Sequence, residues 1–160
     1  MVNDVDLPHL RRCVELARVA LELGEEPFGS VLVSGDDAVL AEERNWVVSG
    51  DQTRHPEFAL ARWAGQHLDA GQRAAATVYT SGEHCPMCSA AHGWVGLGRI
   101  VYVASAAQLG GWLREWGIPA GPVRALSIGD VAPDVVVDGP VPGLDAEVRE
   151  LHARFHGLSG

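Results

Sequence analysis

The chain has 160 residues, of which 47% are hydrophobic and 21% are charged. This length and composition are typical of one globular domain, which we place at residues 1–160. The formal net charge is −9, and the 12 basic residues are all arginines scattered along the chain. A phosphate-binding basic face is therefore not expected, and nucleic acid is an unfavoured partner. No apolar run is long enough to span a membrane and no signal peptide is evident, so we expect a cytoplasmic protein.

Apolar periodicity and turn residues predict alternating helices and strands along the chain. In chain order we expect a helix over 6–24, a hairpin of strands over 29–34 and 38–44, a helix over 55–68, a strand over 75–81, a helix over 86–97, a strand over 99–105, a partly helical connection over 107–122, a fifth strand in either 123–128 or 134–137, and a helix over 144–155.

The connection after the strand over 99–105 is long for a hairpin. Such a length suits a crossover into a parallel strand. Helices and strands in this order predict an α/β fold, a three-layer α/β/α sandwich around a five-stranded mixed sheet.

Two cysteines lie at a predicted strand-to-helix junction, in the sequence Cys-Pro-Met-Cys. Pro86 suits the first helical position, which puts Cys85 near the cap and Cys88 one turn on, with both thiols on one side. The positive end of a helix dipole favours thiolates and prepares both sulfurs for a metal. A thioredoxin-like redox pair has the same spacing, so the pair alone does not decide between the two.

The stretch Arg-His-Pro-Glu-Phe repeats this construction, with His55 near a cap and a proline at the first helical position. Two helices that open in this way can direct their N-termini at one point. His55, Cys85 and Cys88 would then give zinc three protein ligands, whereas a structural zinc site normally has four. Glu57, two residues after the histidine, is placed to move a proton of a bound water.

Two other histidines compete for the fourth zinc position. His84 directly precedes the cysteine pair, and His92 lies one helical turn beyond it. If either closed the site, the zinc would be structural and the domain could serve protein interaction instead of catalysis.

The two motifs resemble the signature H-x-E and P-C-x-x-C of the cytidine deaminase-like superfamily of zinc-dependent deaminases. The resemblance is strongest to the branch with guanine deaminases, yeast-type cytosine deaminase and bacterial tRNA adenosine deaminases, and it implies a fifth strand parallel to the fourth. His84 stands where the family usually has proline, and Pro56 where it usually has a small residue. The similar segments are residues 25–33, 41–47, 54–62, 78–94 and 99–105.

The resemblance implies hydrolytic deamination with Zn²⁺ as the cofactor. In that chemistry the metal activates a water, and Glu57 carries protons to a ring nitrogen and to the departing ammonia. Backbone donors near Glu83 and Cys85 would stabilise the developing negative charge.

The resemblance also implies substrate contacts. Asn45 matches the residue that hydrogen-bonds the edge of the base, and Phe28 and Trp94 match positions where an aromatic ring packs on it. At the rim, His84 would add a donor or a proton carrier. Related guanine deaminases use a second carboxylate after the fourth strand, and that position falls on Trp116 with Glu115 adjacent.

The expected substrate is a free nucleobase or a related amino-heterocycle such as guanine, cytosine or an aminotriazine. The alternative is tRNA adenosine, which the negative charge disfavours. Trp112 and Trp116, one turn apart, could wall an apolar pocket or form a dimer contact, and we expect a homodimer. The C-terminal residues 154–160 could close the pocket, although they carry no acid.

Overall fold

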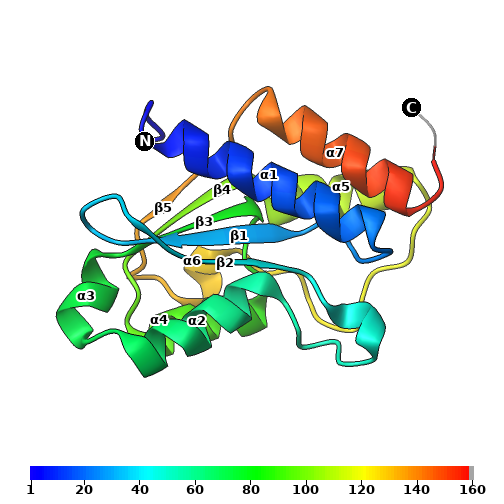
Figure 1. Ribbon diagram of the computed structural model, residues 1–160. Helices are drawn as coiled ribbons and strands as arrows, with labels where there is room; N and C mark the ends of the chain where they lie inside the picture. The colour runs from blue at the N-terminus through cyan, green and yellow to red at the C-terminus, as the bar shows by residue number, and fades with distance from the viewer. Residues whose placement is uncertain (159–160) are drawn as a thin grey trace.

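The computed structural model describes residues 1–158. One sheet with the strand order β2-β1-β3-β4-β5 lies at its centre (Figure 1). β1 pairs antiparallel with β2 and β3, whereas β4 is parallel to both β3 and β5. The predicted mixed sheet and its parallel fifth strand are thereby confirmed. The strands are β1 (Gly29–Val33), β2 (Val39–Arg44), β3 (Thr77–Gly82), β4 (Arg99–Ala104) and β5 (Val137–Asp138).

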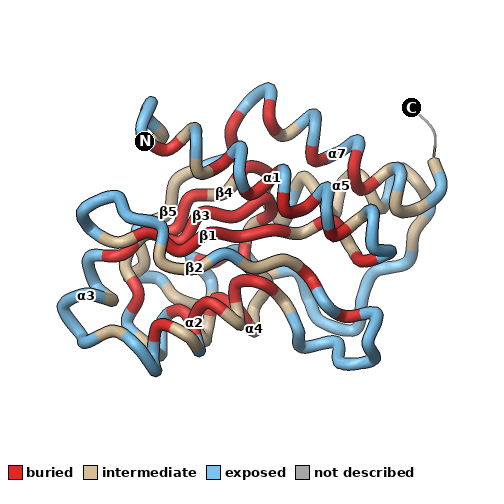
Figure 2. The backbone as a smooth tube through the Cα atoms, viewed as in Figure 1, coloured by how far each residue is buried: buried red, intermediate tan, exposed pale blue. Residues whose placement is uncertain are grey.

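Helices cover both faces of the sheet, which confirms the three-layer sandwich (Figure 1). One layer holds α1 (Asp6–Glu22), α5 (Ala106–Glu115) and α7 (Leu144–Phe155). The other holds α2 (Pro56–His67), α3 (Ala70–Ala75), α4 (Pro86–Val95) and α6 (Ile128–Val131). The buried residues concentrate in the strands and on the inner faces of the helices (Figure 2). None of the described helices has both the length and the apolar character needed to cross a bilayer.

Strand alternation decides which side chains meet the α2 layer. Val31 packs with the α1 and α7 side of the core, and Leu32 packs with the α2 side. Because side chains alternate along a strand, Ser30 shares the α2 side with Leu32, and Thr80 shares it with Val78. Both hydroxyl side chains are completely buried. Each of these strands therefore turns a polar side chain toward the start of α2.

The chain between β4 and β5 differs in detail from the sequence prediction. Residues 123–128 form no strand, because Ser127 and Asp130 make a capping box that begins α6 at Ile128. Of the two predicted positions, only 134–137 overlaps the fifth strand. β5 has just two residues, and Pro140 cannot donate to a sheet ladder beyond it. The short helices α3, α6 and η1 (Val47–Ser49) were not predicted.

Candidate active site

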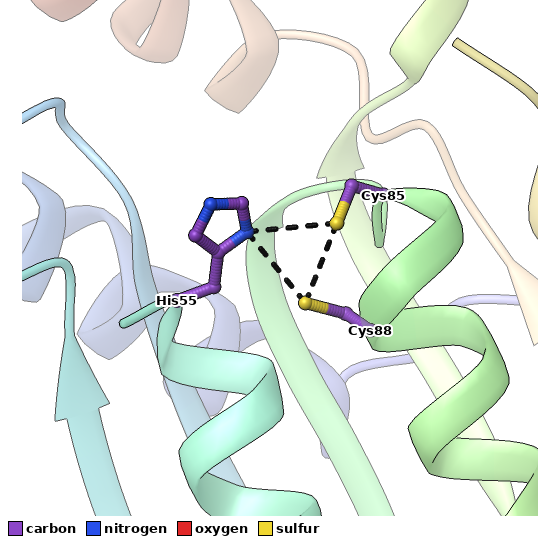
Figure 3. Close-up of side chains that lie close together, drawn as sticks. All are labelled: His55, Cys85 and Cys88. Carbon is purple, nitrogen blue, oxygen red and sulfur yellow. Dashed lines mark hydrogen bonds between the residues drawn. The ribbon is translucent and has the colours of Figure 1, made fainter. Parts of the chain in front are cut away.

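Three predicted ligand atoms converge where α2 and α4 begin. The Nδ1 atom of His55 lies 3.5 Å from the sulfur of Cys85 and 3.7 Å from that of Cys88. The two sulfurs are 3.5 Å apart. In Figure 3 the three side chains point toward one another, the histidine from the start of α2 and the cysteines from the start of α4.

The local sequence explains this convergence. His55 and Cys85 are the N-cap residues of their helices, each with extended backbone and each followed by proline at the first helical position. Proline is favoured there because its fixed φ suits the helix and its missing N–H is not needed. The prediction that two helices open alike and aim at one point is therefore confirmed.

The three donor atoms fit a zinc ion. Tetrahedral zinc, with bonds of about 2.3 Å to sulfur and about 2.0 Å to nitrogen, separates its ligand atoms by roughly 3.5–3.8 Å. The observed separations of 3.5, 3.5 and 3.7 Å match this range. Among residues 1–158, the cluster of metal-binding side chains comprises His55, Cys85 and Cys88, with no fourth member. A structural site closed by a fourth ligand is thus not supported in the part of the chain that the structure describes.

The ionisation of the cluster favours a cation. The hydrogen bond between the two sulfurs lowers the pKa of Cys85 to about 4, although burial acts in the opposite direction, and His55 adds to the lowering. The hydrogen bond with Cys85 raises the pKa of His55. The same bond between the sulfurs, together with burial, raises the pKa of Cys88. The sulfurs of Cys85 and Cys88 and the imidazole of His55 thus share protons at the point where a divalent cation would bind.

Glu57 lies in the first turn of α2, beside this cluster. Its side chain is buried, and its Oε1 atom accepts hydrogen bonds from the hydroxyls of Thr80 at 2.8 Å and Ser30 at 3.1 Å. Burial raises the pKa of this carboxyl group, and the Thr80 bond only partly opposes it. A smaller contribution to the raised pKa of Cys88, after Cys85 and burial, is a hydrogen bond with Glu57. A carboxyl group so placed can hold and release a proton next to the metal ligands.

The structure places Asn45 and Phe28 near the start of β1. Asn45 is completely buried, and its amide nitrogen donates to Glu26 at 3.5 Å. Its Oδ1 atom finds no hydrogen-bond partner among residues 1–158. The ring of Phe28 lies against the backbone of Gly82, where an added Cβ would come within 2.9 Å of it. Both residues therefore stay candidates for substrate contact.

Glu83 and His84, which directly precede Cys85, have surroundings that differ from those expected from the sequence. The backbone N–H of Glu83 already donates to Ala104, so it is not a free donor. The carboxylate of Glu83 instead accepts from the backbone of Ala106 and Ile128, at the starts of α5 and α6. His84 is 1% exposed and meets His92 edge to face, so its predicted place at the rim is wrong.

The remaining predicted contacts lie away from the metal cluster. Trp94 is 90% exposed on α4, and its contact with the base stays a prediction. Glu115 is exposed and pairs with Arg149 of α7 at 2.7 Å. Trp116 packs near His156 outside the cavity that Trp112 lines, so only Trp112 meets the expectation of a pocket wall. Residues 159 and 160 of the predicted closing segment lie outside the described residues.

Sequence reasoning missed the residues that hold Glu57. Ser30 and Thr80 each lie in a short run of β-forming residues, and each points to the same side of the sheet as an apolar neighbour two residues away. A hydroxyl at an inward position of two paired strands is the signal that could have identified them. His152, a buried histidine on α7, was also missed because nothing in its sequence context distinguishes it.

Comparison with known proteins agrees with this geometry. Residues 4–104 match the protein family described as the cytidine and deoxycytidylate deaminase zinc-binding region. That segment is more than half of the chain, and it contains the three candidate ligands and Glu57.

Individual relatives carry several specificities. A probable cytosine deaminase of Schizosaccharomyces pombe is 33% identical over 109 residues, which are 68% of this chain and 65% of that protein. The guanine deaminase of Bacillus subtilis is 40% identical over 97 residues, 59% of this chain and 62% of that protein. The chain thus spans less than two thirds of the length of these relatives. A solved tRNA deaminase that performs A-to-I editing at the wobble position has a TM-score of 0.64 at 27% identity, covering 91% of this chain and 99% of its own.

Proposed function

Since this chain belongs to the family of the cytidine and deoxycytidylate deaminase zinc-binding region, we propose that it is a single-domain, zinc-dependent hydrolase that deaminates a free nucleobase or a related amino-heterocycle. Guanine-, cytosine- and aminotriazine-like rings form the substrate class. The observation that carries the proposal is the set of three donor atoms at zinc spacing, with no fourth ligand among residues 1–158 and a buried carboxyl group beside them.

In this proposal His55, Cys85 and Cys88 hold the metal. Zinc bound by three protein ligands supplies Lewis acidity that brings the pKa of a water close to neutrality. The start of α4 contributes the positive end of its dipole to the same point, which favours the thiolate ligands and negative charge developing nearby.

Glu57 carries the protons of the reaction. Its buried carboxyl group, with a raised pKa, is suited to take one proton from water and pass it to a ring nitrogen. It would then take the second proton, from the hydroxyl group added to the ring, and pass it to the departing amine. Ser30 and Thr80 hold one carboxyl oxygen from the sheet, so that the group is fixed while protons move. Asn45 and Phe28 bind the edge and the face of the ring in this account.

Free heterocycles are favoured over tRNA by charge. The 12 arginines are outnumbered by 21 acidic residues, and a polyanion would meet an overall negative protein. The structural similarity to a tRNA deaminase keeps tRNA adenosine as the alternative substrate.

Ammonia release tests the proposal. Zinc-loaded protein is incubated separately with guanine, cytosine, adenine, an aminotriazine, their available nucleosides, and a tRNA anticodon stem-loop containing adenosine. We expect ammonia from at least one free heterocycle and none from the stem-loop. Ammonia from the stem-loop alone would replace the proposal with its alternative, and no ammonia from any compound would end it.

We also infer a homodimer in the cytoplasm. Trp94 is the most exposed of the large apolar side chains after Met1, and an exposed indole on the outer face of a helix layer favours burial against a second copy. The three cysteines are free thiols, which is usual in a reducing compartment.

A further inference from the structure

A cavity of about 430 Å³ lies between α5, α7 and the chain that follows α5, and none of the candidate metal ligands lines it. One end is formed by Phe28, Gly82 and Glu83, and Glu83 is only two residues before the ligand Cys85. Both helices lie in the same layer, above the end of the sheet where β3 and β4 stop (Figure 1). The apolar walls are made by Leu109, Trp112, Leu113, Ile118, Val123 and Val148.

One polar group in this wall is available to a ligand. His152 is 4% exposed, makes no hydrogen bond to any of residues 1–158, and packs its ring against Phe28 at 4.9 Å between centroids. Burial, with a smaller effect of His156, lowers the pKa of His152 to about 3, so the imidazole is neutral. A neutral imidazole offers one donor and one acceptor. Its ring nitrogens are not among the fully buried polar atoms that lack a partner, so they remain open to a group bound in the cavity.

The charges around the cavity restrict what it can hold. The carboxylate of Glu83 is already occupied by the backbone N–H groups of Ala106 and Ile128. The other charged residues of the lining are Arg114 and Arg124, which form no ion pair among the described residues. Both arginines are exposed, and together with Glu83 they leave the lining with one more positive than negative charge, so the cavity does not favour a cationic group.

The cavity is larger than a bare base requires. Pockets of roughly 300–1,000 Å³ hold drug-sized molecules, and this one lies within that range. Gly110 lines the cavity in the middle of α5, where the nearest side-chain atom to an added Cβ would be Nη1 of Arg114, at 3.4 Å. Glycine in the middle of a helix makes the helix less stable than alanine would, by about 1 kcal/mol. A role in keeping the cavity open would explain why glycine stands there.

We propose that this cavity, named here the α5–α7 chamber, binds a flat apolar substituent on the amino-heterocycle, so that the substrate is a substituted ring that carries no positive charge on the substituent. This inference rests on the proposed deaminase function. The reacting ring lies between Phe28 and the metal centre, and the substituent extends past Phe28 and His152 between the two helices.

Two diaminotriazines that differ by one group test the chamber. Acetoguanamine carries a methyl group where benzoguanamine carries a phenyl ring. Binding is measured by calorimetry on the zinc-loaded Glu57→Gln protein, and ammonia release on the zinc-loaded wild type. Because the phenyl ring buries more apolar surface, we expect benzoguanamine to bind at least about tenfold more tightly.

Two neighbouring glycines provide a matched pair of variants. Gly110→Leu places a side chain in the chamber, whereas Gly111→Leu is on the same helix but outside the lining. Both changes raise helix propensity, so neither is expected to unfold α5. Gly110→Leu should weaken benzoguanamine to the affinity of acetoguanamine, and Gly111→Leu should keep the difference.

The chamber assignment would be overturned if the two compounds bound with equal affinity to the zinc-loaded Glu57→Gln protein. It would also be overturned if Gly110→Leu and Gly111→Leu changed benzoguanamine binding equally. The outcome separates this inference from the proposed function. Selective binding of benzoguanamine without ammonia from any heterocycle would support the chamber and refute deamination. Ammonia release with no preference for the phenyl compound would support deamination and refute the chamber.

Discussion

At the scale of single residues, the site depends on how a buried carboxyl group is held. Glu57 is surrounded by protein, and burial alone raises its pKa. Two buried hydroxyls from neighbouring strands lie within hydrogen-bond distance of its Oε1 atom, and they are 2.8 Å from each other. Thr80 donates to Glu57, and the single proton of Ser30 is directed at either Glu57 or Thr80. The sheet therefore holds the carboxyl group through its Oε1 atom. This arrangement makes Thr80 a positioning residue.

Replacing Thr80 with valine should slow turnover without removing the metal. The change keeps the shape but removes a hydrogen bond to a charged group, worth about 1.5–3 kcal/mol. We expect kcat to fall roughly 10- to 100-fold, with KM and zinc content nearly unchanged. Thr77→Val on the same strand, where the side chain makes no hydrogen bond to another described residue, is the control. An unchanged kcat in Thr80→Val would remove Thr80 from the positioning role.

His84 shows how a departure from a family pattern can be structural. The ring is buried against His92, and the centroids are 5.5 Å apart at an interplanar angle of 82°. Burial lowers the pKa of His84, with a smaller effect of His92, so a neutral ring fills the space behind the cysteines. His92 is fixed in turn by a bond of 2.8 Å with the carbonyl of Gly98.

At the scale of elements, local patterns predicted that His55, Cys85 and Cys88 converge, and the structure brings the three together. The proline after His55 and the proline after Cys85 set helix starts, and helix starts determine where ligand side chains point. The longer helices, the first four strands and the parallel direction of the fifth strand also follow from periodicity and connection length. Each of these features depends on residues close together in the chain.

Features that depend on distant residues could not be predicted. Which strand residues face Glu57 depends on the sheet order, and the chamber exists only because α5 and α7 lie in one layer. Trp116 illustrates the limit: it caps α5 one turn after Trp112, with a backbone hydrogen bond to it, yet its ring lies near His156 and outside the cavity that Trp112 lines. β5 is too short for any pattern to identify it.

At the scale of the whole molecule, the net charge and the exposed apolar surface decide which partners are favoured. A net charge of −9 favours small neutral substrates over a nucleic-acid backbone. The outer face of α4 carries the 90% exposed side chain of Trp94, on the same helix that presents both cysteines to the metal. A second copy that covers this face would stabilise the helix that carries the ligands.

A substitution that introduces one charge tests the proposed dimer. Wild-type protein at micromolar concentration should sediment as a dimer, and Trp94→Glu should shift it to monomer, because a carboxylate in a buried interface is strongly unfavourable. Val48→Glu is the control: it introduces the same charge at another exposed apolar residue, which lies on η1 and is 64% exposed. This variant should remain dimeric. A monomeric wild type, or a dimeric Trp94→Glu protein, would contradict the assignment.

The central claim is that a three-ligand zinc site works with Glu57 as its proton carrier. The most direct measurement compares zinc content and ammonia release for the wild type and Glu57→Gln, with the best heterocycle from the substrate panel. The account predicts one zinc per chain in both proteins and a loss of ammonia release by several orders of magnitude in the variant, because glutamine cannot exchange the proton. Ammonia release at the wild-type rate by zinc-loaded Glu57→Gln would contradict it.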